Sequence, residues 1–509
     1  MSFQIRRVTA ARKKRRFPWE RIPLMLSITR PLVQWYASWR KRRQEEEKHE
    51  MRMTILKRTL LILFAVLCAF LLLAGTVKAL VSLRIISVKS IIAVSGTELP
   101  KDEHGFTNIL LLGQGDVDHD GKDLTDTIIV ASIDPAQTKS AVMLSLPRDL
   151  YLLKTGKMGK GRINSLYRDY KIMLKRKGMK ESEASQEAMK ELAKEIGAHL
   201  NLTIHHVIKA DFTGFVRAVD AAGGVDVNVP YDINDTEYPD ENYGFRTFAI
   251  KAGPAHLDGE TALKYVRSRH TTSDFDRSAR QQQFIVALGE KVKAQKLYRN
   301  TGTIAEMMRI FSEHVEMTMT LRELVGLANL AENVTPSNVI AMQLNDRNGL
   351  YGGLVEPGGF LYTPPRDLFE GASVLLPVSI PEYPVTWKQI HALSTLLFEH
   401  RSIFLSPPTI AILNAGAKSG LGRKLANELI RYGWNVDNVA NATLEKRADS
   451  LVAPAADQDA ETAKFFADLL QLPQAPLPAL LPSVESRRIT IILGKGYTFR
   501  ALQDLLPTE

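Results

Sequence analysis

The chain of 509 residues has a single cysteine, Cys68, so it cannot form an intrachain disulfide. Cys68 lies inside an apolar run, where a small packing residue or a lipid-facing residue is expected. The chain also lacks a Walker-type GK[ST] loop, an HExxH motif, a CxxC pair and a GxSxG elbow. These absences argue against P-loop nucleotide hydrolases, HExxH zinc proteases and α/β-hydrolases. His205 and His206 are neighbours in a predicted strand and point to opposite faces, so they are poor joint metal ligands.

Acidic residues are scarce in the first 58 residues, and this scarcity explains the positive net charge of the whole chain. The formal net charge is +10, but residues 1–58 alone hold 17 Lys and Arg against 5 Asp and Glu. The remainder is therefore close to neutral. The basic clusters at 11–17 and 39–50 have two interpretations: nucleic-acid binding, or a topology signal that also touches anionic lipid. We favour the second and predict no nucleic-acid partner.

An uncharged apolar run covers residues 59–77, TLLILFAVLCAFLLLAGTV. As a helix, these 19 residues would span roughly 28 Å, close to the thickness of the bilayer hydrocarbon. A cleaved signal peptide would have a shorter apolar region and a shorter charged leader. The positive-inside rule places residues 1–58 in the cytoplasm. We therefore predict a signal-anchored, single-pass protein of the cell membrane, with the segments after the helix extracytoplasmic.

Apolar runs and helical periodicities alternate along the exported part, which indicates an α/β layered domain. The expected strands are 106–113, 127–133, 140–146, 202–210 and 225–230, and the expected helices are 181–199, 212–224, 257–269, 275–295, 303–314 and 320–332. A second α/β unit follows Pro408, with strands at 409–413, 434–442 and 488–494 and helices at 423–433 and 461–472. Residues 350–405 show no clear pattern.

These patterns divide the chain into six segments. They are a basic cytoplasmic tail (1–58), a transmembrane helix (59–80), a stalk (81–104), a catalytic α/β domain (105–345), a linker of uncertain structure (346–406) and a small C-terminal α/β domain (407–497).

An acidic loop follows the first predicted strand. It contains Asp116, Asp118, Asp120, Asp123 and Asp126. Clustered carboxylates suit Mg²⁺ or Ca²⁺, although a solvated turn without metal is the alternative. An EF-hand is disfavoured, because the bidentate Glu is missing and a strand follows. We prefer Mg²⁺ held by one or two of these carboxylates together with substrate phosphates.

Arginines form the second group of candidate residues. They are Arg148 in SLPRD, Arg267 and Arg269 in YVRSR, and Arg277 and Arg280 in DFDRSARQQQF. Arg277, Arg280 and Gln281 have the i, i+3, i+4 spacing of one helix face. The guanidinium fork matches phosphate oxygens, whereas ion pairs with Asp149, Asp274 and Asp276 are the plain alternative. Arginines beside an acidic metal loop are typical of a pyrophosphate site.

The motifs taken together resemble the LytR-CpsA-Psr family of cell wall glycopolymer ligases. The matching segments are ILLLGQGD (109–116), LTDTIIVASIDP (124–135), SLPRDLY (145–151), GRINSLY (161–167), DFTGFVRAVDAAGGVDVNVP (211–230), LDGETALKYVRSRH (257–270) and DFDRSARQQQF (274–284). Residues 409–494 are similar to the small LytR C-terminal domain that often follows in this family.

The resemblance implies an α-β-α sandwich with a mixed central sheet and a hydrophobic tunnel for a polyprenyl chain, with the lipid pyrophosphate at its mouth. It implies that Asp116 and Asp126 bind Mg²⁺. It also implies phosphate contacts from Arg148, Arg267, Arg269, Arg277 and Gln281, with Arg280 a further candidate.

Three positions depart from the family pattern. Gly115 precedes Asp116, so Asp118 or Asp120 can take the place of the first metal ligand. Asp276 stands where a small residue normally precedes Arg277, and it could add a base, a ligand or an ion pair. A Lys/Glu-rich insert occupies the region around 170–195.

The resulting hypothesis is a Mg²⁺-dependent phosphotransferase for cell wall biogenesis. It moves a phosphate-linked glycopolymer from a polyprenyl-pyrophosphate carrier to a hydroxyl of peptidoglycan, with Asp274 as the expected base. Two alternatives stay open: a polyprenyl-pyrophosphate phosphohydrolase, and a non-enzymatic membrane-bound receptor or regulator.

Overall fold

The structure is a computed structural model. It describes residues 98–116, 123–239, 244–268, 274–295, 310, 313–345, 358–378, 385–442, 448–454, 456, 459–476 and 488–506. The predicted tail, membrane helix and most of the stalk lie outside these residues, as does most of the predicted helix 303–314. Within the described residues no helix is long and apolar enough to cross a membrane. Residues 94–509 form one compact unit, which is the one described below.

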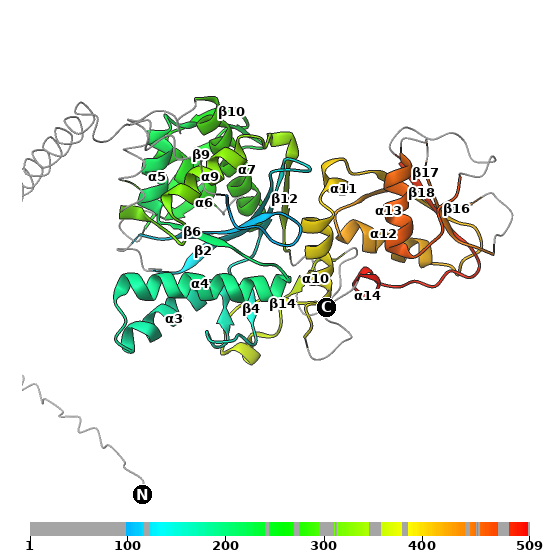
Figure 1. Cartoon of the computed structure of the whole chain (residues 1–509), viewed down its shortest axis with the longest axis horizontal. Coiled ribbons are helices and arrows are strands. Elements are labelled where there is room, and N and C mark those ends of the chain that lie inside the picture. The colour runs from blue at the N-terminus through cyan, green and yellow to red at the C-terminus, as the bar shows by residue number, and fades with distance from the viewer. Residues whose placement is uncertain are drawn as a thin grey trace, which may run out of the picture. The chain divides into compact units, whose positions relative to one another are not determined.

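A six-stranded mixed sheet forms the centre of this unit, in the order β11-β6-β1-β2-β3-β12 (Figure 1). Its strands are β1 (Thr107–Gln114), β2 (Thr125–Asp134), β3 (Ser140–Ser145), β6 (His206–Ala210), β11 (Val315–Met317) and β12 (Val339–Gln343). The β1–β6 and β3–β12 pairs are parallel, and the other three pairs are antiparallel. The predicted mixed α/β sheet is therefore confirmed.

The apolar runs of β1 and β2 form strands because helices cover both faces of the sheet. Leu110 and Val130, which pair across these strands, are both fully buried. Helices α3 (Ile163–Arg176) and α4 (Glu181–Leu200) lie on one side of the sheet in Figure 1. On the other side are α5 (Phe212–Ala221), α6 (Gly259–Arg267), α7 (Asp274–Ala294) and α9 (Leu321–Ala331).

Two antiparallel ribbons pack beside α6 and α7 around a separate apolar cluster. One pairs β7 (Val225–Val229) with β10 (Gly253–Leu257), and the other pairs β8 (Ile233–Pro239) with β9 (Phe245–Ile250). Only β7 is predicted from the sequence. Smaller elements are β4 (Tyr151–Leu152), β5 (Gly161–Arg162), β13 (Leu361–Tyr362), β14 (Leu376–Pro377) and the 3₁₀ turns Pro336–Asn338 and Arg366–Phe369.

Residues 388–405, which belong to the segment that the sequence leaves unassigned, are mostly helical and contact the central sheet. α10 (Lys388–Ser394) continues as a π-helical turn (Thr395–Glu399) and is followed by α11 (Ser402–Leu405). Arg401 is almost fully buried, with Nη2 2.8 Å from Ser132 Oγ on β2 and its guanidinium 3.7 Å from the Phe106 ring centroid. A buried arginine with these partners ties the helical segment to the sheet.

The C-terminal residues form a four-stranded sheet in the order β16-β15-β18-β17. It contains β15 (Thr409–Asn414), β16 (Asn435–Asn441), β17 (Leu451–Pro454) and β18 (Arg488–Leu493), with helices α12 (Leu421–Arg431), α13 (Ala460–Leu470) and α14 (Leu502–Leu505). All of its predicted strands and helices are present, and β17 and α14 are additions.

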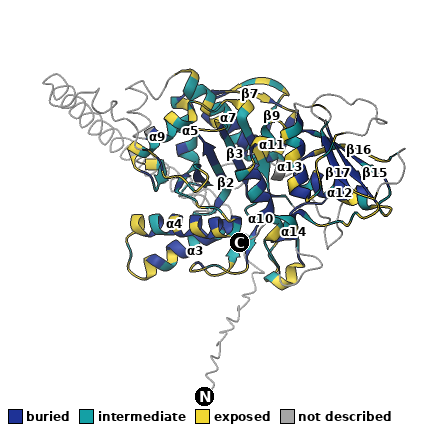
Figure 2. Cartoon of the chain, turned by 45° about the vertical axis from the view of Figure 1, so that its right-hand side comes forward, coloured by how far each residue is buried: buried dark blue, intermediate teal, exposed yellow. Residues whose placement is uncertain are grey.

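The two sheets share one apolar core. The buried cluster that includes Leu110 and Val130 continues through Phe360 and Leu396 to Tyr432 and Trp434. The rings of Phe360 and Tyr432 meet edge to face with centroids 5.2 Å apart. Figure 2 shows buried residues running through both sheets.

Candidate functional site

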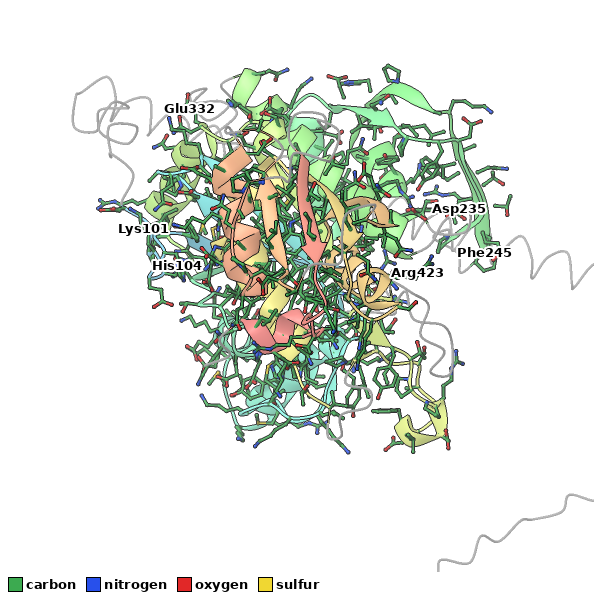
Figure 3. All side chains as sticks on the ribbon, turned by 90° about the vertical axis from the view of Figure 1, so that its right-hand side faces the viewer. Lys101, His104, Asp235, Phe245, Glu332 and Arg423 are labelled. Carbon is green, nitrogen blue, oxygen red and sulfur yellow. The ribbon has the colours of Figure 1, made fainter. Side chains whose placement is uncertain are left out.

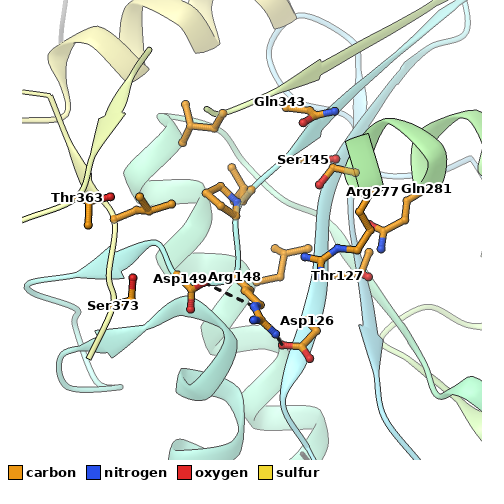
Figure 4. A pocket seen from close by; sticks show the side chains of 16 residues that line it. Asp126, Thr127, Ser145, Arg148, Asp149, Arg277, Gln281, Gln343, Thr363 and Ser373 are labelled. Carbon is orange, nitrogen blue, oxygen red and sulfur yellow. Dashed lines mark hydrogen bonds and ion pairs between the residues drawn. The ribbon is translucent and has the colours of Figure 1, made fainter. Parts of the chain in front are cut away.

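A cavity of about 200 Å³ lies between β2, β3, the start of α7 and the residues after β12 (Figure 4). Its lining combines two arginines and two carboxylates with hydroxyl, amide and apolar side chains. The lining residues are Asp126, Thr127, Ile128, Ser145, Leu146, Pro147, Arg148, Asp149, Arg277, Ser278, Gln281, Gln343, Leu344, Thr363, Ser373 and Leu375. Four predicted site residues therefore meet here: Asp126, Arg148, Arg277 and Gln281.

Arg148 stands in the cavity between two carboxylates. Its Nη1 lies 3.4 Å from Asp126 Oδ1, and its Nε lies 3.6 Å from Asp149 Oδ2. Arg162 Nη1 contacts the other oxygen of Asp149 at 3.3 Å. The ion pair between Arg148 and Asp149 that the sequence offers as an alternative is thus formed, and it coexists with the cavity position. The side chain of Arg148 keeps 26% of its surface exposed, so a ligand can reach it.

The start of α3 fixes both Asp126 and Arg148. Asn164 Nδ2 donates to Asp126 Oδ1 at 3.2 Å, and the Asn164 backbone N–H donates to the carbonyl of Arg148 at 3.3 Å. Asn164 is itself buried, so it forms a fixed anchor for these two partly exposed charged residues. Asn164 is missed by the charge-based sequence argument, although it lies within the GRINSLY motif.

The first turns of α7 supply the opposite wall of the cavity. Arg277 and Gln281 both line it, as their i, i+4 spacing predicts. The adjacent Gln282 fixes the helix on the sheet, because its Nε2 lies 3.2 Å from Met143 O and 2.8 Å from Met342 O, on the neighbouring strands β3 and β12. Gln282 is a positioning residue that the sequence argument does not identify.

Arg280 shares the α7 turn but not the cavity. It is almost fully buried, and its guanidinium donates to the carbonyls of Tyr265 (3.0 Å) and Ser268 at the end of α6. The three residues at i, i+3 and i+4 therefore do not share one role. Arg277 and Gln281 line the cavity, whereas Arg280 holds the C-terminal end of α6.

Arg267 ends α6 outside the set of cavity-lining residues. Its guanidinium packs over the Phe212 ring at 4.0 Å, and its Nη1 lies 3.4 Å from the Tyr238 hydroxyl on β8. The next residue, Ser268, donates to the buried carboxylate of Asp235 at 2.7 Å. Hairpin β8–β9 thus orients the YVRSR segment. Arg269 lies outside the described residues, as does the side chain of Asp274.

Each end of the acidic loop is bound to a different helix. The two carboxylate oxygens of Asp116 accept from the backbone N–H and the hydroxyl of Thr213, both at 3.0 Å, at the start of α5. At the other end, both oxygens of Asp123 lie 3.0 Å from Nζ of the buried Lys171 on α3. Asp118 and Asp120 lie outside the described residues. Asp276 is half-buried on the first turn of α7.

The donor set fits Mg²⁺ in part. Asp126 has a 44% exposed carboxylate that opens into the cavity, and Mg²⁺ commonly uses one or two carboxylates plus phosphate oxygens. Asp116 is absent from the cavity lining and binds Thr213 instead. Among the described residues, no three His, Cys, Asp or Glu side chains converge on one point. A cation here would therefore depend on substrate oxygens.

A small apolar pocket adjoins the cavity, and Leu146 lines both. Its other walls are Leu150, Leu152, Ile163, Ile196, His199, Leu200 and Trp387, and its volume is about 10 Å³. This is close to the space of one water molecule, so side chains have to move before a prenyl chain can enter. The hydrophobic tunnel implied by the resemblance stays a prediction.

Two family models match the chain. The LytR_cpsA_psr family covers residues 84–358, and the LytR cell envelope-related transcriptional attenuator model covers residues 408–497.

Two of the similar proteins are transferases or biosynthesis proteins by name. The chain is 29% identical to the polyisoprenyl-teichoic acid–peptidoglycan teichoic acid transferase TagV of Bacillus subtilis over 47% of this chain and 56% of TagV. It is 25% identical to the cell wall biosynthesis protein LcpA of Corynebacterium glutamicum over 80% of this chain and 76% of LcpA. The crystal structure of B. subtilis TagV matches with a TM-score of 0.40 at 24% identity, over 58% of this chain and 97% of that one. Since the first family model spans more than half of the chain, the protein belongs to the LytR_cpsA_psr family.

Proposed function

We propose that the protein is a Mg²⁺-dependent phosphotransferase that moves a glycopolymer from a polyprenyl-pyrophosphate carrier to peptidoglycan. The cavity supports this proposal best, because Arg148, Arg277 and the carboxylate of Asp126 line one space of about 200 Å³. A pyrophosphate needs this combination: arginine forks for its oxygens, and a carboxylate to share a cation with it. The name of TagV describes a transferase of the same kind.

The reaction breaks one phosphoanhydride bond and forms one phosphodiester. A hydroxyl of peptidoglycan attacks the phosphorus attached to the glycan, loses its proton to a base, and polyprenyl phosphate leaves. Arg148, Arg277 and Gln281 bind and orient the phosphates, and Asn164 and Gln282 hold these groups in place. Positioning and electrostatics suffice for such a transfer, so no covalent nucleophile is required.

Mg²⁺ would be held by Asp126 and by phosphate oxygens, and when bound it supplies positive charge at the phosphates. Asp116 is the second expected ligand, which requires its carboxylate to leave Thr213 or to use its remaining lone pairs. Arg267 and Arg269 are further proposed phosphate contacts, Arg280 is a proposed support of α6, and Asp274 is the proposed base. The uncharged run 59–77 would anchor the enzyme in the membrane that holds its lipid substrate, with the catalytic unit outside.

A transfer assay tests this function. The full chain in lipid nanodiscs is incubated with a synthetic polyprenyl-pyrophosphate glycan, Mg²⁺ and wall fragments, beside the double variant Arg148→Ala, Arg277→Ala. Glycan phosphate on the fragments with the wild type alone supports the ligase. Free glycan phosphate with unmodified fragments indicates a pyrophosphate hydrolase instead, and binding of the lipid without turnover indicates a receptor.

A further inference from the structure

Two exposed leucines lie on neighbouring segments of the unit. Leu153 follows β4 and keeps 47% of its surface exposed, and Leu368 in the 3₁₀ turn Arg366–Phe369 keeps 69%. The rings of Tyr151 and Phe369 meet edge to face with centroids 5.0 Å apart, which joins the two segments. Each leucine is within two residues of this aromatic contact. Together they form an exposed apolar surface, of the kind that marks a contact with a partner or a membrane.

The loop that carries Leu153 is basic. Residues 153–160 contain three lysines and no acidic residue. Two of these lysines, Lys154 and Lys160, are exposed, and within the described part of the chain neither has an ion-pair partner. The neighbouring turn at 366–370 holds one Arg, one Asp and one Glu, so the surface keeps a positive balance. Exposed leucines beside unneutralised lysines suit the surface of an anionic bilayer, which offers both apolar depth and phosphate charge.

Two buried glutamates of α4 hold this loop in place. Glu195 accepts from the backbone N–H of Gly156 at 2.6 Å and from that of Lys157 at 3.4 Å. Glu191 Oε2 lies 3.2 Å from Lys157 Nζ. Because its backbone is bound to a helix, the loop presents its leucine and its other two lysines in a fixed arrangement.

This surface lies near the end of α4 where the chain enters the unit. Glu195, which binds the loop, belongs to the last two turns of α4. Just beyond that helix, the carbonyl of Thr203 accepts from Asn108 Nδ2 at 2.8 Å. The same amide nitrogen lies 2.8 Å from Asp102 Oδ2, in the entry segment 98–106. The loop and the entry segment are therefore at the same end of α4.

A membrane is expected on this side of the unit. Figure 3 shows Lys101 and His104 of the entry segment at the edge of the unit opposite Phe245. Only residues 78–97 separate this segment from the run 59–77, which is predicted to cross the membrane. The side of the unit beside the entry segment is therefore the side that a bilayer reaches first.

The small apolar pocket lies at the same end of α4. Ile196, His199 and Leu200 from the last turns of this helix line it. Leu152, the residue before Leu153, is another of its walls. Apolar surface thus continues from the pocket to the exposed loop, and a bilayer on that loop would bring prenyl chains close to the pocket.

We propose that the surface formed by Leu153, Leu368, Lys154 and Lys160 is a membrane contact of this unit. The two leucines enter the interfacial region of an anionic bilayer, and the two lysines contact its lipid phosphates. The inference goes beyond the proposed reaction, because it gives the folded unit a membrane attachment of its own besides the predicted anchor. It also fixes which side of the unit faces the bilayer.

Quenching of a fluorophore by lipid tests the contact in the full chain. Cys68→Ser removes the only cysteine, and an environment-sensitive fluorophore is attached to Leu153→Cys in that background. The protein is placed in nanodiscs of phosphatidylcholine and phosphatidylglycerol that contain a spin-labelled lipid. The emission is expected to be blue-shifted and strongly quenched, because the label lies in lipid. Val439→Cys, at a position on β16 that is 46% exposed, carries the matched control label and is expected to stay unquenched.

The lysines are tested in the same nanodiscs with the label at position 153. Each of Lys154→Gln and Lys160→Gln is expected to lower the ratio of docked to undocked label about fivefold, the effect of one basic side chain near an anionic surface. Lys418→Gln, an equal loss of charge at an exposed lysine of the C-terminal part, is expected to leave this ratio unchanged. Nanodiscs of phosphatidylcholine alone are expected to lower the ratio in the parent protein as well.

Three results would overturn the membrane contact. The first is a label at position 153 that is quenched no more than the label at position 439. The second is equal docking on neutral and anionic nanodiscs, which would remove the lysines from the contact. The third is a blue shift without quenching, which would show that a protein or a second copy of the chain covers this surface instead of lipid.

The transfer assay separates this inference from the proposed function. Leu153→Glu is expected to slow transfer from a long prenyl carrier embedded in the nanodisc and to leave transfer from a water-soluble, short-prenyl carrier unchanged. Lipid quenching at position 153 in a protein that transfers nothing rejects the transferase and keeps the contact. Transfer from the embedded carrier, together with an unquenched label at position 153, keeps the transferase and rejects the contact.

Discussion

Arg148 Nη1 and Asp126 Oδ1 lie 3.4 Å apart in the lining of the cavity, with Asp126 also held by Asn164. The pair brings the arginine of SLPRD to the carboxylate of LTDT, 22 residues earlier in the chain. The carboxylate orients the guanidinium before any substrate binds. An arginine held in this way needs little reorganisation when phosphate oxygens arrive, which is the condition for electrostatic catalysis.

Replacement of Arg148 by alanine is expected to lower the transfer rate about 100-fold or more, because a preorganised donor to the phosphates is lost. Arg148→Lys should restore little of it, since an ammonium group cannot form the bidentate fork. The rate is measured with a synthetic lipid-linked glycan, and circular dichroism checks that each variant is folded. The control is Arg176→Ala, which also removes one positive charge but lies outside the cavity lining. Full activity of Arg148→Ala would refute the assigned role.

Replacement of Asp126 by asparagine should raise the Mg²⁺ concentration that gives half-maximal transfer by about tenfold or more, since a carboxylate ligand becomes a neutral amide. Chelation of Mg²⁺ should abolish transfer in the wild type, and addition of Mg²⁺ should restore it. The comparison variant is Asp149→Asn, which removes a cavity carboxylate that is not a proposed ligand. An equal shift of the Mg²⁺ dependence in both variants would argue against a specific role for Asp126.

Local patterns predict the elements of this fold well, because burial imposes a period on each of them. The apolar runs of β1, β2 and β3 and the helical spacing of α7 are correct to within about two residues. The patterns fail for hairpin β8–β9, whose strand INDTEYP is rich in polar residues and buries only Ile233, Asp235 and Tyr238. Its stability comes from contacts with α6 and α7, which no local pattern contains.

The candidate site shows the same limit. Residue type and motif position bring Asp126, Arg148, Arg277 and Gln281 to one cavity. They cannot show that Arg280 is buried while Gln281 lines the cavity. The two residues are adjacent on α7, and the contacts of α7 with neighbouring elements decide which side chain is buried. They also cannot identify Asn164 or Gln282, whose roles depend on contacts between elements that are distant in the sequence.

One glutamate in the insert around residues 170–195 makes the free energy of unfolding depend on pH in the acid range. Its Glu181 lies 2.7 Å from Lys171 Nζ and also contacts Lys175. These lysines lower the pKa of Glu181 from 4.5 to about 2, the bond to Lys171 having the largest effect. A depressed carboxyl pKa stabilises the folded state above pH 4.5, and this contribution is lost as the pH falls toward 2.

Glu181→Gln should therefore lower the free energy of unfolding at pH 7 by about 0.5 kcal/mol, a small value because the carboxylate is half exposed and screened by water. The difference from the wild type should disappear near pH 2. Urea unfolding of both proteins at a series of pH values measures it. Glu183→Gln, on the same helix turn and without a resolved ion pair, is the control. A difference that grows as the pH falls would contradict this assignment.

The shared core predicts how the two sheets unfold. The helices of residues 388–405 lie between them, with Arg401 bound to Ser132 on β2 and Phe360 packed on Tyr432 of the C-terminal part. Separation of the sheets would expose Trp434 and Tyr432, which are both almost fully buried. Because this boundary is apolar and continuous, we expect a single cooperative transition for the whole unit in differential scanning calorimetry.

The variant Arg401→Met, which has a similar volume but lacks the bonds to β2, should lower the midpoint of that transition without splitting it. Two separate transitions in the wild type would show that the C-terminal sheet is an independent domain.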